Sequence, residues 1–163
     1  MKLLPPIAAC LCAFAFPLAA QVLEVIPNRV MADESAAIRV KGLQPNERIT
    51  IRAELVDGAG HEWVSHAEFV ADAQGIVDAS QQAPSAGSYK KVSPMGLIWS
   101  MLPTSKNVAI YQSMRDLAPQ PIEFHLMRKG EKIASARLDQ VTIPEGVQRI
   151  PAVCAISTVG PSA

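Results

Sequence analysis

Apolar and polar residues alternate along several short segments of the chain, and this pattern predicts β-strands. The alternation is clear in residues 22–26, 37–41 and 49–56. Successive side chains of a strand point to opposite faces, so each segment can bury one face and expose the other. The third segment ends in the turn-forming residues 57–60, and a further alternating segment follows at 63–70. These two segments are therefore expected to form an antiparallel hairpin.

The second half of the chain also contains segments that are expected to form strands. A short strand is expected at 76–78, and two longer strands at 122–127 and 132–138 flank the turn residues 128–131. Residues 140–143 are a candidate extension. Short strands about ten residues apart are typical of an antiparallel sandwich of two sheets. No segment shows sustained helical periodicity, and 13 prolines argue against long helices. The expected fold class is all-β.

One segment departs from the alternation. It combines large apolar residues with Pro and Gly, which disfavour regular structure. Its members are Pro94, Met95, Gly96, Leu97, Ile98 and Trp99. Tertiary contacts must hold such a segment in place, since neither a helical stripe nor a strand pattern supports it.

Composition narrows the classes of function. Lys plus Arg and Asp plus Glu both number 15, so the chain lacks the net positive charge of proteins that bind nucleic acid or anionic membranes. The only dense basic group, Arg128-Lys129 with Lys132, is interrupted by Glu131 and fits a solvated turn. An apolar content of 49% is enough for a folded core.

The N-terminus resembles a secretory signal peptide. Lys2 precedes an uncharged apolar run over 3–20, and small residues stand before Gln21. Cleavage there predicts export, periplasmic or secreted, with no membrane span left. A retained membrane helix and a lipoprotein site at Cys10 are the less favoured alternatives. The mature chain would keep Cys154 as its single cysteine, so no disulfide within the chain is expected.

The sequence contains no complete catalytic or metal-binding motif. It has no Gly-x-Ser-x-Gly or Gly-x-Cys-x-Gly elbow around a nucleophile, and no glycine-rich phosphate loop. The histidines at 61, 66 and 125 are scattered without metal-ligand spacing. In the strand at 63–70, His66 and Glu68 share the face opposite Trp63 and Phe69, so they are expected to be solvated. No catalytic, metal or cofactor residue is predicted, and the residues alone indicate a binding or structural module.

Ordered phrases along the chain resemble the N-terminal domain of the acyl-CoA thioesterase and bile acid-CoA:amino acid N-acyltransferase family. They run from about Pro27 to Arg149 and include Asp33-Glu34, Gly42-Leu43-Gln44-Pro45, Gly87-Ser88-Tyr89, Pro94-Met95-Gly96-Leu97-Ile98-Trp99-Ser100 and Gly146-Val147-Gln148-Arg149. The resemblance implies an immunoglobulin-like β-sandwich that precedes an α/β-hydrolase domain. In this family the hydrolase domain carries the nucleophile, an Asp and a His, and acts on acyl-CoA thioesters.

This resemblance divides the chain into a signal peptide at 1–20, an immunoglobulin-like domain at 21–150 and a divergent tail at 151–163. The expected function is that of a non-catalytic N-terminal domain, inactive alone and truncated before the hydrolase, in acyl-CoA and fatty acid metabolism. Its expected partner is an α/β-hydrolase domain or subunit, and residues 94–99 are the candidate docking surface. The alternative for that segment is that Leu97 and Trp99 close the end of the core. The alternative function is a free-standing exported immunoglobulin-like binding module.

Overall fold

The computed structural model describes residues 20–115, 118–144 and 146–147. The predicted cleavage site, the tail at 151–163 and Cys154 depend on residues outside these ranges. Within them, no helix has the length and apolar character needed to cross a membrane.

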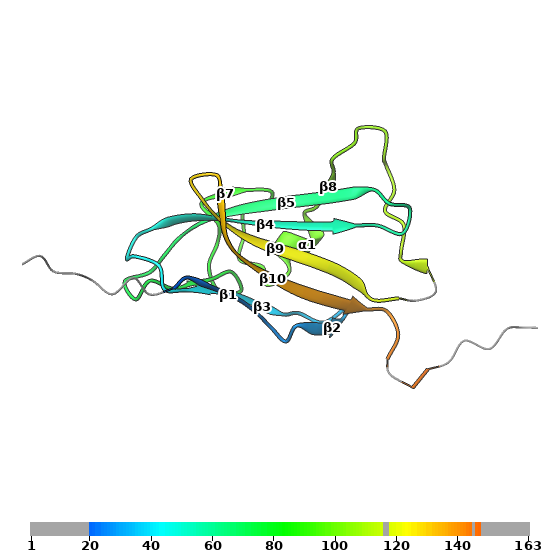
Figure 1. Ribbon diagram of the computed structural model, residues 1–163, viewed down its shortest axis with the longest axis horizontal. Helices are drawn as coiled ribbons and strands as arrows, with labels where there is room; N and C mark the ends of the chain where they lie inside the picture. The colour runs from blue at the N-terminus through cyan, green and yellow to red at the C-terminus, as the bar shows by residue number, and fades with distance from the viewer. Residues whose placement is uncertain (1–19, 116–117, 145, 148–163) are drawn as a thin grey trace, which may run out of the picture.

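The described residues form two β-sheets (Figure 1). The smaller sheet has the order β1 (Val22–Ile26), β3 (Ala37–Lys41) and β6 (Val77–Asp78). The larger sheet has the order β2 (Arg29–Met31), β10 (Glu131–Val141), β9 (Gln120–Arg128), β4 (Arg48–Val56), β5 (Glu62–Val70) and β7 (Ala86–Gly87), and β8 (Leu102–Pro103) also pairs with β5. The expectation of an all-β chain is confirmed.

Both predicted hairpins are present. Strands β4 and β5 pair antiparallel around the predicted turn. Arg48 lies opposite Val70 at one end of the hairpin, and Val56 lies opposite Glu62 at the other. Strands β9 and β10 pair antiparallel around Lys129 and Gly130, whose φ angles are 49° and 88°. Positive φ at both central residues is what a tight hairpin turn between twisted strands requires. Strand β2 is the exception to the antiparallel pattern, because it runs parallel to β10.

One hydrophobic core joins the two sheets. Alternation places Ile38 and Val40 of β3 in the same buried cluster as Ile51 of β4 and Phe124 of β9. All four side chains are fully buried. Burial of each such side chain contributes about 1.5–3 kcal/mol of hydrophobic stabilisation, so this shared layer is the main source of the fold's stability.

The weakly patterned segment after β6 contains regular structure that the alternation did not predict. It forms β7, a single helical turn α1 (Gly96–Trp99) and β8. The sequence shows no sustained helical periodicity here, and the helix that forms is a single turn of four residues. Leu97 is 1% exposed, and the backbone carbonyl of Leu97 accepts a hydrogen bond from the buried Ser65 hydroxyl of β5. These contacts, rather than a helical pattern, hold α1 against the large sheet.

Candidate functional site

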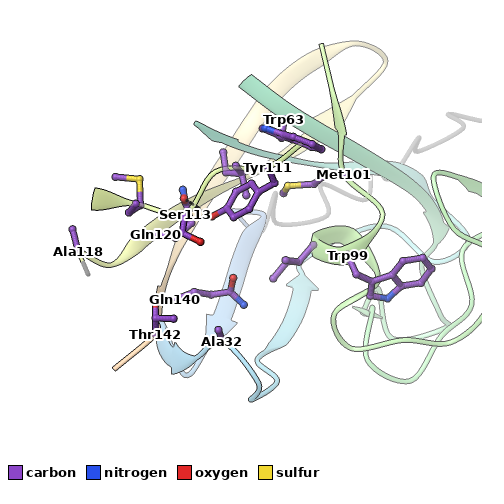
Figure 2. Close-up of a pocket in the computed structure, with 13 residues that line it drawn as sticks. Ala32, Trp63, Trp99, Met101, Tyr111, Ser113, Ala118, Gln120, Gln140 and Thr142 are labelled. Atoms are coloured by element: carbon purple, nitrogen blue, oxygen red, sulfur yellow. Dashed lines mark hydrogen bonds between the residues drawn. The ribbon is translucent and has the colours of Figure 1, made fainter. Parts of the chain in front are cut away.

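A cavity of about 340 Å³ opens at the end of the core, beside α1 (Figure 2). Its walls come from segments far apart in the chain: β4, β5, α1, residues 111, 113, 114 and 118, and the ends of β9 and β10. The lining residues are Ala32, Leu55, Trp63, Ile98, Trp99, Met101, Tyr111, Ser113, Met114, Ala118, Gln120, Gln140 and Thr142. Ligand pockets in proteins have volumes from about 300 Å³ upward, so this cavity can hold a small molecule.

The carboxylate of Asp57 anchors one side of the cavity. Asp57 follows β4, and its side chain is fully buried. Its oxygens accept hydrogen bonds from the backbone N–H groups of Ala59, His61 and Gln112 and from the indole N–H of Trp63. Burial by itself raises the pKa of Asp57, but these four donors stabilise the charged form and hold the pKa well below its usual range. Asp57 is therefore a structural anion whose hydrogen-bonding capacity is already used.

A chain of contacts leads from Asp57 into the cavity wall. The ring of Trp63 meets Tyr111 edge-on, with centroids 5.9 Å apart. Figure 2 shows Tyr111 between Trp63 and Gln120, and its hydroxyl donates a hydrogen bond of 2.9 Å to Oε1 of Gln120. Burial and the charge of Asp57 raise the pKa of Tyr111, so the hydroxyl remains a donor at neutral pH. A hydrogen bond therefore fixes each end of the Trp63–Tyr111 pair: Trp63 donates to Asp57, and Tyr111 donates to Gln120.

Two glutamines face each other across the inner side of the large sheet. Gln140 of β10 lies directly opposite Gln120 of β9, in line with the buried pair Leu138 and Ile122. The amide of Gln120 is satisfied, because its Nε2 donates to the carbonyls of Val56 and Pro121. The amide of Gln140 has no hydrogen-bond partner among the described residues, and Figure 2 shows it pointing into the cavity. Its two donors and its acceptor are therefore unused within the described part of the chain.

The described lining contains no charged side chain. Aromatic, aliphatic and thioether groups dominate it, and the polar groups are hydroxyls and amides. A buried charge without a partner is costly, whereas a neutral polar group needs one or two hydrogen bonds. The cavity is therefore suited to neutral molecules that are mainly apolar.

The backbone of the 111–113 segment is pressed against the β4–β5 turn. The N–H of Gly58 donates a hydrogen bond of 2.7 Å to the carbonyl of Gln112. A Cβ atom added at Gly58 would lie 2.1 Å from the carbonyl oxygen of Ser113. This close approach explains why the turn carries glycine here: no side chain fits between the two segments.

The structure separates the residues of the predicted docking segment. Leu97 and Gly96 are buried, Met95 and Ile98 are half-buried, and Pro94 is exposed. Trp99 is 64% exposed, although its indole N–H donates a hydrogen bond of 3.0 Å to the Ser93 hydroxyl. Ile98 and Trp99 also line the cavity. Leu97 therefore packs in the core, whereas Trp99 presents an indole to solvent.

The other residues considered from the sequence do not assemble into a reactive centre within the described ranges. His66 and Glu68 lie on the exposed face of β5, as their parity predicts. Nδ1 of His61 lies 3.3 Å from Asp57 Oδ2, but no described hydroxyl or thiol forms a hydrogen bond with His61. No group of three His, Cys, Asp or Glu residues that could hold a metal ion occurs in the described part of the chain.

The sequence interpretation missed Gln120, Gln140 and the cavity. A signal was present: both glutamines occupy core-facing positions of the alternation, where an apolar residue is expected. A polar residue on the buried face of a strand often serves a partner or a ligand, and two of them on neighbouring strands strengthen that interpretation.

Comparison with known proteins agrees with the resemblance drawn from the sequence motifs. Residues 33–153 match the family described as acyl-CoA thioester hydrolase/BAAT N-terminal region. Similar proteins include the mitochondrial acyl-coenzyme A thioesterase 2 of Rattus norvegicus, 33% identical over 130 residues, and acyl-coenzyme A thioesterase 1 of Homo sapiens, 31% identical over 130 residues. Each alignment covers 76% of this chain, but only 28% and 30% of those relatives.

The chain thus spans less than a third of the length of these two relatives, and the matching region is the part that the family description places at the N-terminus. The family match covers most of the chain, including every strand from β3 to β10. The chain belongs to the acyl-CoA thioester hydrolase/BAAT N-terminal region family.

Proposed function

We propose that this chain acts as the non-catalytic N-terminal region of an acyl-CoA thioesterase-type protein and works with an α/β-hydrolase catalytic region. The observation that supports this most directly is the family match over 33–153. The curated relatives are acyl-coenzyme A thioesterases, so the reaction served is thioester hydrolysis of acyl-CoA.

The chemistry of the described residues supports a non-catalytic role. Cleavage of a thioester needs a nucleophile activated by a neighbouring base. The nearest approach to such a pair is Asp57 with His61, and the Asp57 carboxylate is held by four N–H donors that fix the turn. Its role in this structure is to join the β4–β5 hairpin to the 111–113 segment.

We also propose that the fold is an immunoglobulin-like sandwich. The order β4-β9-β10 in one sheet and β1-β3-β6 in the other corresponds to the C-F-G and A-B-E strands of that architecture. The shared core between the sheets fits the same assignment.

The proposed docking surface for the catalytic region is the segment Pro94–Trp99, with Trp99 as its centre. The indole of Trp99 is 64% exposed, which leaves a large apolar surface in contact with water. Tryptophan is enriched at the centres of protein interfaces, where such a surface is buried. Leu102 of β8, which is 69% exposed, follows closely in the chain and adds apolar surface. The buried Leu97 anchors this surface to the core.

A chimaera tests the proposed function. Residues 21–147 of this chain would replace the matching N-terminal region of human acyl-coenzyme A thioesterase 1, and acyl-CoA hydrolysis would be measured. The chimaera is expected to hydrolyse acyl-CoA, and this chain alone is not. Turnover by the purified chain alone would refute the non-catalytic role. A folded chimaera without activity would refute the role as an N-terminal region.

Two variants of the chimaera test the docking surface. Trp99→Ser is expected to reduce activity or increase protease sensitivity between the two regions. Val22→Ser, which removes an apolar side chain 45% exposed on the smaller sheet, serves as the matched control. Equal effects of the two substitutions would contradict docking through Trp99.

We further propose that the chain is exported after cleavage before Gln21. Lys2 and the apolar run that follows it support this. Expression with the native N-terminus, followed by mass spectrometry of the exported fraction, is expected to yield a product that begins at Gln21. A product that retains Lys2 would contradict cleavage.

A free-standing exported binding module is the second candidate function. The observation that favours it is the cavity, whose lining includes an amide on Gln140 with no partner in the described structure. Full activity of a catalytic region without this chain, together with ligand binding by the chain alone, would favour this alternative.

A further inference from the structure

The polar groups of the cavity are placed at one side of an otherwise apolar chamber. Gln120 and Gln140 lie near the ends of β9 and β10, and Thr142 directly follows β10. Leu55, Ile98 and Met101 supply apolar wall. A ligand that fits this arrangement has an apolar body and a hydrogen-bonding group at one end.

The free amide is the most specific feature of the site. Oε1 of Gln120 accepts a hydrogen bond from Tyr111, and its Nε2 donates to two backbone carbonyls, so the amide of Gln120 already has partners within the protein. Gln140, directly opposite, retains two donors and one acceptor among the described residues. It can therefore donate to or accept from a hydroxyl, carbonyl or amide.

Charge sets the class of ligand. The buried anion nearby, Asp57, is saturated by N–H donors, and no described lining side chain can pair with a ligand charge. We propose that the cavity binds a small neutral molecule with an apolar body and a single hydroxyl, carbonyl or amide group, which hydrogen-bonds to Gln140. This inference does not depend on a catalytic partner, so it can fail or succeed separately from the proposed function.

The tryptophans give a direct readout of binding. The chain has two tryptophans, and both Trp63 and Trp99 line the cavity. Occupancy is therefore expected to change the intrinsic fluorescence without any introduced label.

The experiment titrates the purified chain with three molecules that share one alkyl chain: 1-octanol, octanoate and octylammonium. Tryptophan emission and calorimetry would follow binding. Saturable binding of 1-octanol is expected, and the two ions are expected to bind at least about tenfold more weakly, because each would bury an unpaired charge. Absence of saturable 1-octanol binding, or equal affinity for either ion, would overturn the proposal.

Two substitutions locate the ligand. Gln140→Leu preserves the side-chain size and is expected to weaken 1-octanol binding about fivefold, the effect of one lost hydrogen bond. Unchanged or tighter binding would overturn the assignment to Gln140. Ala118→Phe fills the cavity and is expected to abolish binding, whereas Ala73→Phe, at an exposed alanine of the turn before β6, is expected to leave it unchanged. Circular dichroism would establish that each variant is folded.

Discussion

The indole N–H of Trp63 donates a hydrogen bond of 3.2 Å to the buried carboxylate of Asp57. This bond joins β5 to the turn that follows β4, and the same carboxylate also accepts from the backbone of Gln112. One anion thus connects a hairpin to a segment more than fifty residues away in the sequence. The position of the cavity wall depends on this connection.

Asp57→Asn is expected to lower stability at neutral pH and to reduce the dependence of stability on acid. The folded-state pKa of Asp57 is lowered, so its charge stabilises the fold above the unfolded pKa of about 3.9. This contribution is lost as the pH falls below that value towards the lower pKa of the folded state. Urea denaturation across this acid range would measure the effect.

The exposed Asp33 provides the control for this experiment, since Asp33→Asn is expected to leave the denaturation midpoint unchanged. Some acid dependence should remain in Asp57→Asn, because Asp78 also has a lowered pKa. Burial by itself raises the pKa of Asp78, but the hydrogen bonds from Arg39 and Ser80 and the charge of Arg39 together lower it by more. An acid profile identical to that of the parent would show that Asp57 does not contribute through its charge.

Gly58→Ala is expected to displace the 111–113 segment from the β4–β5 turn. The new Cβ would lie 2.1 Å from the Ser113 carbonyl oxygen, and such overpacking costs about 1–3 kcal/mol. Hydrogen exchange of the Gly58 and Gln112 amides should accelerate, because both amides bridge the two segments.

Gly60→Ala is the matched control in the same turn. Gly60 has a φ of +87°, and a Cβ added there would meet no described atom within 4 Å. The cost of this substitution, about 1 kcal/mol, therefore comes from the backbone alone. It should leave exchange at Gln112 slow. Equal acceleration in both variants would attribute the effect to turn strain rather than to the clash.

Leu97→Ala and Trp99→Ala are expected to differ strongly in stability. Leu97 is 1% exposed, and its truncation should cost about 2–5 kcal/mol. Trp99 is 64% exposed and retains one tilted ring contact with Tyr89, so its truncation should cost at most about 1.5 kcal/mol. Chemical denaturation would measure both values. A larger loss for Trp99→Ala would contradict the division of this segment into a core residue and a surface residue.

Tyr89→Phe is expected to preserve stability at neutral pH and to increase resistance to alkali. The Tyr89 hydroxyl is buried without a hydrogen-bond partner among the described residues, so its removal relieves a cost. Burial raises the pKa of Tyr89 to about 12. The parent should therefore lose stability as the pH rises from about 10 through 12, since the unfolded chain ionises first.

Thermal melts of the parent and Tyr89→Phe over that alkaline range would test this. Tyr111→Phe provides a comparison, because the Tyr111 hydroxyl donates to Gln120 and its loss should lower stability at neutral pH. Destabilisation by Tyr89→Phe at neutral pH would mean that the hydroxyl has a partner in solution.

Most strands could be predicted from the sequence because their signal is local. In 63–70, parity alone placed Ala67 and Phe69 in the core and His66 and Glu68 in solvent, and the structure agrees. The short strands β2, β7 and β8 carry too few residues for a pattern, and each forms by pairing with a distant strand. The helical turn α1 likewise depends on Leu97 and Gly96 packing against β5 and Tyr89.

Side-chain alternation and turn chemistry act over neighbouring residues, so the amino-acid sequence was enough to specify the long strands, both hairpins and the core-facing positions. Which polar residues meet across the fold depends instead on tertiary pairing. The register of β9 and β10 shifts between Lys132 and Ala134, and this irregularity is what places Gln140 opposite Gln120. A shift of one residue turns every later side chain to the other face of a strand. The cavity and the free amide of Gln140 therefore depend on how β9 and β10 pair. The alternation of apolar and polar residues within one strand does not specify this pairing.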